Sequence, residues 1–480
     1  MIKKALMLQT VLLSMTAVAE TTFTVAEPVV MGETPHAMSP SVAQAWQETN
    51  ASDIPSYHVP LMAEGLDVRR IEDFIAYALQ SRQWQSLGQL LTEYEALPNH
   101  DVILVHYAKG AMLRARGEQK QAIAHYRQIL DKASDLPYVR LDLALMLFED
   151  KQYKEAAALM ERLLVEDIAE PAKVVLRDAL NTMQKQQAWQ PTLNVNYERT
   201  DNVNNASSER EIVWLGRRWQ KQADSLPKEA HGVRYGAGLD KETNVSGNHY
   251  VGFDVSVDGV QYFDVDGYDE LNTRLSAGYK YQDLKRTWRV SPFFEKGWLD
   301  DEAYSRSVGV SGGYGQGVGA KTYWQLNANY AQKFYEDGRQ AENYDSTLAS
   351  LGLSVSRRIN RQVLIFGGVD VGLDDTNNPE YASKRHGLRM GVVRDVSGGL
   401  GMSASLRYAK RRFDAPESLV YRFVREDDEY QAAFNLWHDK FSWRGLRPEL
   451  NLRYVNIDSN MPAFYSRDGV SYYMSLGKKF

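Results

Sequence analysis

The sequence predicts a short tetratricopeptide helical array followed by an antiparallel transmembrane β-barrel of about 14 strands. Three observations support this fold class. Residues 188–480 alternate apolar and polar side chains at period two, residues 67–187 repeat at a fixed spacing, and residues 1–19 resemble a secretory signal peptide. The mean hydropathy is −0.46. Since no run of 18 apolar residues occurs, the sequence argues against a helical membrane protein.

The amino terminus has the parts of a secretory signal. Lys3 and Lys4 supply positive charge, residues 5–16 are mostly apolar, and Ala17-Val18-Ala19 is a small-x-small cleavage site. We therefore expect cleavage after Ala19 and export from the cytoplasm. Residues 20–66 contain several prolines and serines without periodicity, so we expect a flexible leader there.

Charge and cysteine content restrict the functional classes. Cleavage would remove Lys3 and Lys4 from 56 basic residues, leaving 54 against 62 acidic residues and a net charge of −8. This balance argues against nucleic acid as a partner. The chain has no cysteine, which excludes disulfides, thiolate metal sites, a cysteine nucleophile and a lipid-modified amino-terminal cysteine.

Residues 67–187 are rich in Leu, Ala, Gln, Glu, Lys and Arg and lack strand signals, so they are predicted to be helical. A shift of 34 residues, the tetratricopeptide period, aligns five pairs. The pairs are Gly110 and Ala144, Leu113 and Leu147, Ala122 and Ala156, Tyr126 and Met160, and Pro137 and Pro171. With a degenerate earlier repeat the array has about three repeats, the minimum for a stable stack, and residues 171–187 are expected to cap it. A generic helical bundle is the alternative.

Repeat stacks of this kind present a concave groove to a protein ligand. The spacing puts six side chains of two consecutive repeats at groove-lining positions, although some of them must also serve the core of the array. These candidate partner-binding residues are Leu104, Tyr107, Arg114, Tyr138, Leu141 and Phe148.

Residues 188–480 are predicted to form the barrel, because strands with apolar and polar faces suit a wall between lipid and water. Leu351–Ser356 and the final segment Gly469–Phe480 show the alternation. About fifteen candidate strands can be drawn, and the weakest, Ile212–Trp219, fits a loop better. Bacterial single-chain barrels have even strand numbers, so fourteen is the best estimate. A soluble β-sandwich is the alternative. Aromatic residues near strand ends are expected to form interfacial girdles, namely Tyr262, Phe263, Trp298, Tyr304, Tyr335, Tyr421 and Trp437.

No catalytic constellation rises above background, so we expect neither an enzyme nor a cofactor or metal site. Asp264–Glu270 resembles a calcium loop only faintly, since the twelfth position lacks a carboxylate. The glycine-rich run Gly312–Gly319 is expected at a turn between strands. Lumen charges such as Arg407, Arg411 and Asp370 are expected to form salt bridges, with control of pore permeability as the alternative.

Three stretches of the sequence resemble a known family. They are Thr200–Ala206; Arg425–Gln431 with Leu436–His438; and Arg447–Leu450 with Tyr454, Asp458–Asn460 and the last strand to Phe480. Together with the signal peptide, the repeats and the barrel, they resemble the surface lipoprotein assembly modulators, called Slam. The barrel resembles the DUF560 domain of that family, and the resemblance extends over nearly the whole mature chain.

The resemblance implies an outer-membrane translocator that delivers lipoproteins, or soluble relatives of them, from the periplasm to the cell surface. Family clients include receptors or binders for transferrin, lactoferrin, haemoglobin and complement factor. The periplasmic helices would engage the client or its chaperone, and the barrel, set in outer-membrane lipid, would provide or assist the exit path together with the barrel-assembly machinery. An exopolysaccharide export porin with a periplasmic repeat scaffold is the alternative; a diffusion porin and an outer-membrane phospholipase are more distant ones.

Overall fold

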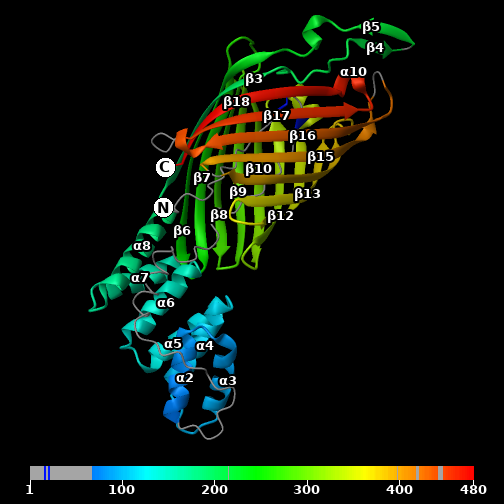
Figure 1. Ribbon diagram of the computed structural model, residues 1–480. Helices are drawn as coiled ribbons and strands as arrows, with labels where there is room; N and C mark the ends of the chain where they lie inside the picture. Colours follow the sequence, from blue (N-terminus) through cyan, green and yellow to red (C-terminus); the bar gives the residue numbers. More distant parts are fainter. Residues whose placement is uncertain are drawn as a thin grey trace.

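Between Val68 and Gln187 the chain folds into seven helices that stack one after another at one end of the barrel (Figure 1). The computed structural model describes residues 16–17, 20–21, 68–214, 216–396, 398–417, 421–441 and 447–479. The helices are α2 Val68–Gln80, α3 Trp84–Glu95, α4 Val102–Ala115, α5 Gln119–Lys132, α6 Pro137–Glu149, α7 Tyr153–Leu164 and α8 Glu170–Gln187.

Close approach of paired helices explains the small residues in the repeat pattern. A Cβ atom added at Gly110 in α4 would lie 2.5 Å from Cε2 of Tyr126 in α5, so only glycine fits that contact. Ala122, Ala144 and Ala156, at the equivalent contacts, are fully buried. Pro137 begins α6. Its missing N–H costs no hydrogen bond there, because the first N–H groups of a helix have no partner within the helix. These contacts make α4 with α5 and α6 with α7 two antiparallel helix pairs of a repeat array.

Fourteen of the described strands close into one antiparallel barrel, which confirms the predicted fold class and strand number. The wall follows sequence order, and β18 pairs with β3 to close it. Its strands are β3 Gln190–Thr200, β6 Ala230–Ser246, β7 His249–Tyr262, β8 Glu270–Gln282, β9 Arg286–Leu299, β10 Glu302–Val318, β11 Thr322–Tyr335, β12 Ser346–Arg358, β13 Val363–Thr376, β14 Ser383–Val396, β15 Leu400–Pro416, β16 Val424–His438, β17 Arg447–Ser459 and β18 Arg467–Lys479.

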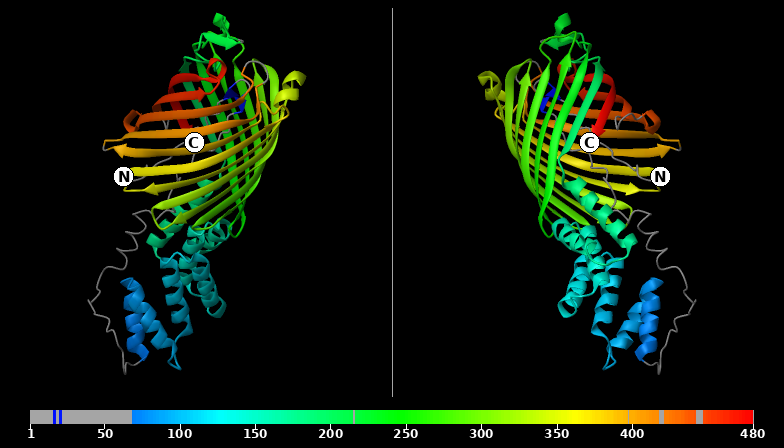
Figure 2. Two further views of the ribbon diagram at one scale, coloured as in Figure 1. Left: turned by 90° about the vertical axis from the view of Figure 1, so that its right-hand side faces the viewer. Right: turned by 90° about the vertical axis from the view of Figure 1, so that its left-hand side faces the viewer.

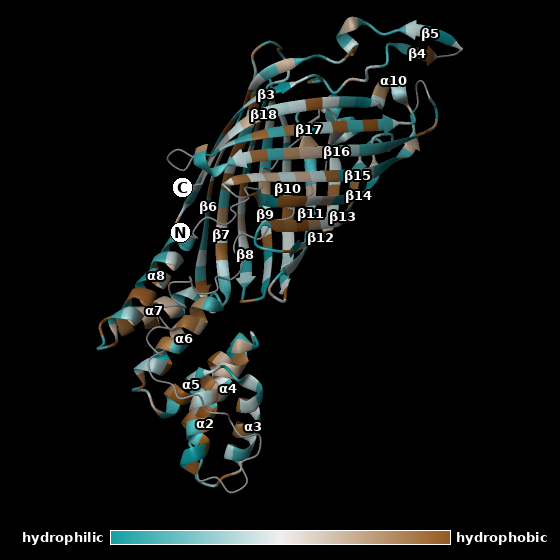
Figure 3. Cartoon of the chain, in the orientation of Figure 1, coloured by the Kyte–Doolittle hydropathy of each residue, from teal (hydrophilic) through white to brown (hydrophobic). Residues whose placement is uncertain are grey.

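Apolar and polar residues alternate along the strands of the wall, as the brown and teal bands of Figure 3 show. Leu351, Leu353 and Val355 on β12 are 46%, 40% and 44% exposed on the outside. The intervening Ser354 and Ser356 are 3% and 4% exposed, and they face inward. A strand of this kind places alkyl side chains in lipid and hydroxyls in the lumen.

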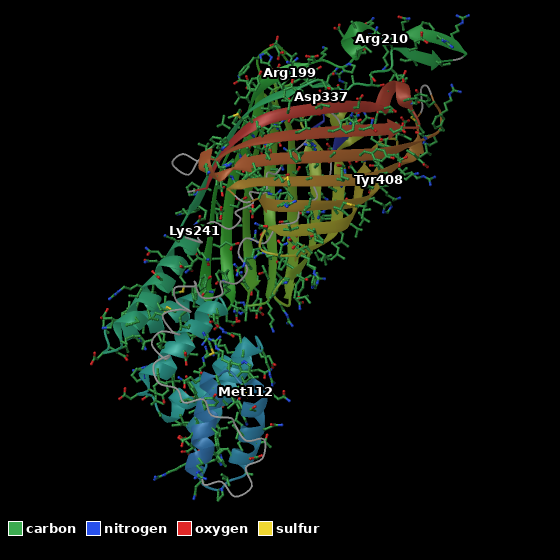
Figure 4. The ribbon with its side chains drawn as sticks, viewed as in Figure 1. Met112, Arg199, Arg210, Lys241, Asp337 and Tyr408 are labelled. Carbon is green, nitrogen blue, oxygen red and sulfur yellow. The ribbon has the colours of Figure 1, made fainter. Side chains whose placement is uncertain are left out.

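The two ends of the barrel differ in the length of their connections. At the end that carries the helices, Gly247–Asn248 joins β6 to β7, and 283–285 joins β8 to β9. Most connections at the other end are longer. Residues 201–229 there contain β4 Glu211–Trp214, β5 Arg217–Gln220 and the 3-10 turn η1 Ala223–Ser225; two other connections carry α9 Gly338–Tyr344 and α10 Pro462–Tyr465. In Figure 4, Lys241 lies near the helices and Arg210 at the opposite end. Short turns mark the periplasmic end and long loops the extracellular end.

The weakest candidate strand, Ile212–Trp219, indeed stays out of the barrel wall. It forms the separate hairpin of β4 and β5 above the extracellular end (Figure 2).

A turn of the 3-10 type, η2 Asp439–Phe441, follows β16. Two short strands, β1 Thr16–Ala17 and β2 Glu20–Thr21, pair with each other. Apart from these four residues, the expected signal peptide 1–19 and leader 20–66 lie outside the described residues.

Two smaller expectations are wrong. The glycine-rich run does not form a turn, because β10 continues through Val318 and only Gly319, with φ +62°, belongs to the connection. Tyr335 and Trp437, expected in the outer girdles, are buried on the lumen side of the wall. Trp437 lies against Gly401, where an added Cβ would be 2.2 Å from the indole ring. The ring fills the space that this glycine leaves on the neighbouring strand.

None of the helices that the structure describes is both long and apolar enough to cross a membrane.

An arginine on the lipid face is expected to destabilise the barrel. Leu351→Arg, near the middle of β12, should lower the free energy of unfolding by about 2–4 kcal/mol, since it places a charge in hydrocarbon. Ser350→Arg, one residue away on the lumen face, is the matched control and should change it far less. Guanidine unfolding of the barrel in lipid vesicles measures both. Equal losses in the two variants would contradict the assignment of faces.

Candidate functional site

The six groove candidates lie on two neighbouring inner helices of the array. Leu104, Tyr107 and Arg114 are on α4, and Tyr138, Leu141 and Phe148 are on α6. Leu104 packs against the core of the first repeats, while Tyr107, Leu141 and Phe148 pack, partly buried, against the core of the later ones. Tyr138, in the first turn of α6, is 54% exposed. Of the six, Tyr138 therefore presents the most free apolar surface to a partner.

A buried carboxylate, Asp142, joins α4 to α6 beneath the groove. Its Oδ2 accepts a hydrogen bond of 2.9 Å from the hydroxyl of Tyr107, and Arg114 Nη1 lies 3.7 Å from its Oδ1. Arg114 also donates to Glu149 through Nη2 at 2.6 Å and Nε at 3.1 Å. Burial raises the pKa of Asp142, whereas Arg114 and Tyr107 favour its charged form. Tyr107 and Arg114 thus hold adjacent repeats in register, a role that sequence spacing cannot distinguish from ligand binding.

The helical array is fixed to the periplasmic end of the barrel by a polar joint. Its centre is Asp150, a buried residue in the turn between α6 and α7. Asp150 Oδ2 accepts from Asn248 Nδ2 at 3.2 Å, and Oδ1 accepts from the Leu284 N–H at 3.3 Å. The hydroxyl of Tyr250 donates to the carbonyl of Lys151. Two barrel turns and the start of β7 thereby bind the turn between α6 and α7.

Further contacts extend this joint to the last helices. Asn244 Oδ1 on β6 accepts from the Lys154 N–H of α7 at 2.9 Å, and the Asn244 N–H donates to Gln187 Oε1 of α8 at 2.9 Å. The rings of Tyr153 and Tyr250 meet edge to face with centroids 6.1 Å apart. Burial raises the pKa of Asp150, although hydrogen bonds from Gln152, Asn248 and Leu284 favour the carboxylate. The sequence pattern did not identify this joint, because its residues come from separate, individually ordinary turns.

The barrel lumen is lined by paired charges. Arg407 Nη2 is 2.8 Å from Asp370 Oδ2, and Arg411 Nε is 3.4 Å from Glu429 Oε1, which confirms the predicted salt bridges. Elsewhere on the wall, Arg234 Nε of β6 is 2.6 Å from Glu198 Oε2 of β3. The lumen is therefore polar, with its charges largely compensated. Among the described residues, no group of three or more histidine, aspartate or glutamate side chains is placed to hold a metal ion.

Parts of the stretches that carry the family resemblance meet at the extracellular end, whereas residues 436–438 and 447–450 lie at the periplasmic ends of β16 and β17. Residues 201–206 follow β3, residues 425–431 begin β16, and residues 458–460 end β17. Asn202 Nδ2 donates to the carbonyl of Asp468 at 3.3 Å, and Asn460 Oδ1 accepts from the Glu426 N–H at 3.0 Å. Segments distant in sequence thus form one structure around α10.

The fold and these sites define the class: an outer-membrane β-barrel with a repeat domain in the periplasm, docked on the near end of the barrel. Residues 189–480 match the family described as surface lipoprotein assembly modifier. Residues 67–160 match that family's N-terminal tetratricopeptide repeats. The chain belongs to the surface lipoprotein assembly modifier family, and the resemblance seen in the sequence is confirmed.

Relatives match over most of their length. A surface lipoprotein assembly modifier of Pasteurella multocida is 26% identical over 425 residues, covering 84% of this chain and 81% of the relative. The hemophilin secretion modulator of Acinetobacter baumannii is 26% identical over 424 residues, covering 84% of each chain. Surface lipoprotein assembly modifier 1 of Neisseria meningitidis serogroup B is 26% identical over 392 residues, covering 80% of this chain and 77% of the relative.

Loss of the central carboxylate of the joint should loosen the helical array. Asp150→Ala removes the carboxylate acceptor of the Leu284 N–H, at a cost of about 1–3 kcal/mol if this donor stays buried, whereas Asn248 Nδ2 keeps the carbonyls of residue 150 and Gln282. Amide hydrogen exchange in α6–α8 should become faster, while exchange in the barrel strands stays unchanged. Asp131→Ala, at an exposed position of α5, is the control. Identical exchange in the two variants would show that Asp150 does not fix the domains.

Proposed function

We propose that this chain moves client proteins from the periplasm to the cell surface, the clients being surface lipoproteins or soluble proteins related to them. The family match supports this role and favours it over exopolysaccharide export. The observation that carries the proposal is the position of the repeat array. It is held by Asp150 and Asn244 at the periplasmic end of a barrel with a polar lumen, where an outgoing client would arrive.

The groove of α4 and α6 would recognise the client or a chaperone that delivers it. Tyr138 offers an exposed ring, and its neighbour Tyr107 lies 6.0 Å away between centroids, in an edge-to-face contact. Leu104, Leu141 and Phe148 give the groove an apolar floor, and Arg114 holds its shape through Glu149. An extended or helical client segment with apolar side chains fits such a surface.

The barrel would provide or assist the exit path, surrounded by outer-membrane lipid and working with the barrel-assembly machinery. The periplasm lacks ATP, and the sequence contains no nucleotide-binding motif. Folding of the client outside the cell would therefore supply the driving force. A client variant unable to fold should then accumulate in the periplasm. Equal export of folding and non-folding clients would refute this driving force without affecting the translocator role.

The decisive experiment is surface display of a lipoprotein encoded beside this chain, expressed in a laboratory Gram-negative strain with and without it. Protease added to intact cells should digest the client only when this chain is present. Removal of residues 67–187 should abolish display while leaving a heat-modifiable, folded barrel. A client that stays protected beside a correctly inserted barrel would overturn the proposal for that client.

A point variant tests recognition separately. Tyr138→Ala should reduce surface display several-fold, because it removes the most exposed apolar side chain of the groove candidates. Gln128→Ala, at an exposed position on α5 of the neighbouring repeat, is the control. Binding of purified residues 67–187 to the client should fall in parallel. Wild-type display and binding by the Tyr138 variant would remove Tyr138 from the recognition surface.

A further inference from the structure

A short helix, α10, is packed into the extracellular end of the barrel. Met461, just before it, is fully buried, and Ala463 within it is 6% exposed. Two other loops hold the helix. Ser207 Oγ donates to the Pro462 carbonyl at 2.8 Å, and the Ala463 N–H donates to the Tyr421 hydroxyl at 3.3 Å. The connection between β17 and β18 therefore turns inward and is fastened there.

The inner side of α10 rests on a lumen cation. Arg425 lies on the inner face of β16, in register with Asp427 and Glu429, and is 5% exposed. Its guanidinium carbon is 3.6 Å from the ring centroid of Tyr465 in α10 and 4.4 Å from that of Phe413 on β15. Arg425 Nη2 also pairs with Asp427 Oδ2 at 2.7 Å. The guanidinium thus lies between an aromatic ring of the wall and an aromatic ring of the loop helix.

A second helix, α9, approaches from the other side of the opening. The ring of Tyr344 lies 4.5 Å from that of Tyr381 and 5.9 Å from that of Tyr335, between centroids. Asn378 Nδ2 donates to Asn343 Oδ1 at 2.9 Å and ties α9 to the next loop. Burial and Tyr381 raise the pKa of Tyr344, and Tyr465 of α10 adds to that rise. α9 and α10 belong to connections on different sides of the barrel opening, β11 to β12 and β17 to β18.

We propose that α10 is an extracellular gate, closed in this structure by the contact of Tyr465 with Arg425, and that it moves aside when a client leaves. This inference rests on the proposed function, since a client needs an open exit. The barrel wall need not change. Pairing between β16 and β17 continues to Asp427 and Ser459, whereas the contacts of α10 with Ser207, Tyr421 and Arg425 lie outside the strand ladder. Its displacement breaks those contacts and no pairing between strands.

Conductance tests the gate without any client. Purified full-length chain is inserted into planar lipid bilayers, and ion current is compared between wild type, Tyr465→Ala and Tyr465→Phe. The alanine variant should conduct several-fold more than wild type, because the ring over Arg425 is lost. The phenylalanine variant keeps the ring and should resemble wild type. Equal conductance of wild type and the alanine variant would overturn the gate.

Cross-linking tests the gate during transport and does not depend on the stability of a Tyr465 variant. Since the chain has no cysteine, Tyr421→Cys with Phe464→Cys, whose native ring centroids are 5.9 Å apart, gives a unique pair. A reducible bis-thiosulfonate reagent on intact cells should stop surface display, and reductant should restore it. Each single-cysteine variant is a control. Unchanged display by the cross-linked protein would refute the gate, whereas lack of display by wild type would refute the proposed function alone.

Discussion

Closure of the barrel through β18 and β3 is the constraint on which the rest of the structure depends. A membrane wall must leave no backbone N–H or carbonyl unpaired in hydrocarbon, so the first and last strands must meet. Pairing runs from Ser471 with Thr200 to Lys479 with Thr192. Because β3 begins only three positions after α8 ends at Gln187, closure also fixes where the repeat array enters the barrel. Domain placement is therefore a consequence of strand pairing.

The joint around Asp150 converts this covalent proximity into a defined orientation. A peptide linker alone would let the array rotate, whereas hydrogen bonds join it to two barrel turns, at Asn248 and Leu284, and to Asn244 on β6. Buried polar contacts of this kind fix geometry more than they add stability, because each must satisfy donors that would otherwise remain unpaired. The proposed recognition groove and the barrel are consequently held at one relative position.

The two ends of the barrel are built for different tasks. At the periplasmic end, the short turns between β6 and β7 and between β8 and β9 are hydrogen-bonded to the helical array. The extracellular end has mostly longer connections, and there the guanidinium of Arg425 lies against the rings of Phe413 and Tyr465. A cation between aromatic rings in a partly dry site is strong enough to hold a short helix, yet it breaks without unpairing any strand. In the proposed gate, movement is confined to the extracellular loops and the strand pairing of the wall is kept.

The sequence by itself determined the fold class, the strand number and the repeat array, because each depends on local periodicity: alternation at period two along Leu351–Ser356, and spacing of 34 residues from Gly110 to Ala144. It also proposed the groove positions but not their roles. Only the tertiary structure decided that Tyr107 and Arg114 join repeats whereas Tyr138 stays exposed. The polar joint around Asp150 and the contacts of α10 could likewise be found only from the tertiary structure. They bring together residues about 40 to 260 positions apart, and such pairs leave no periodic signal in the sequence.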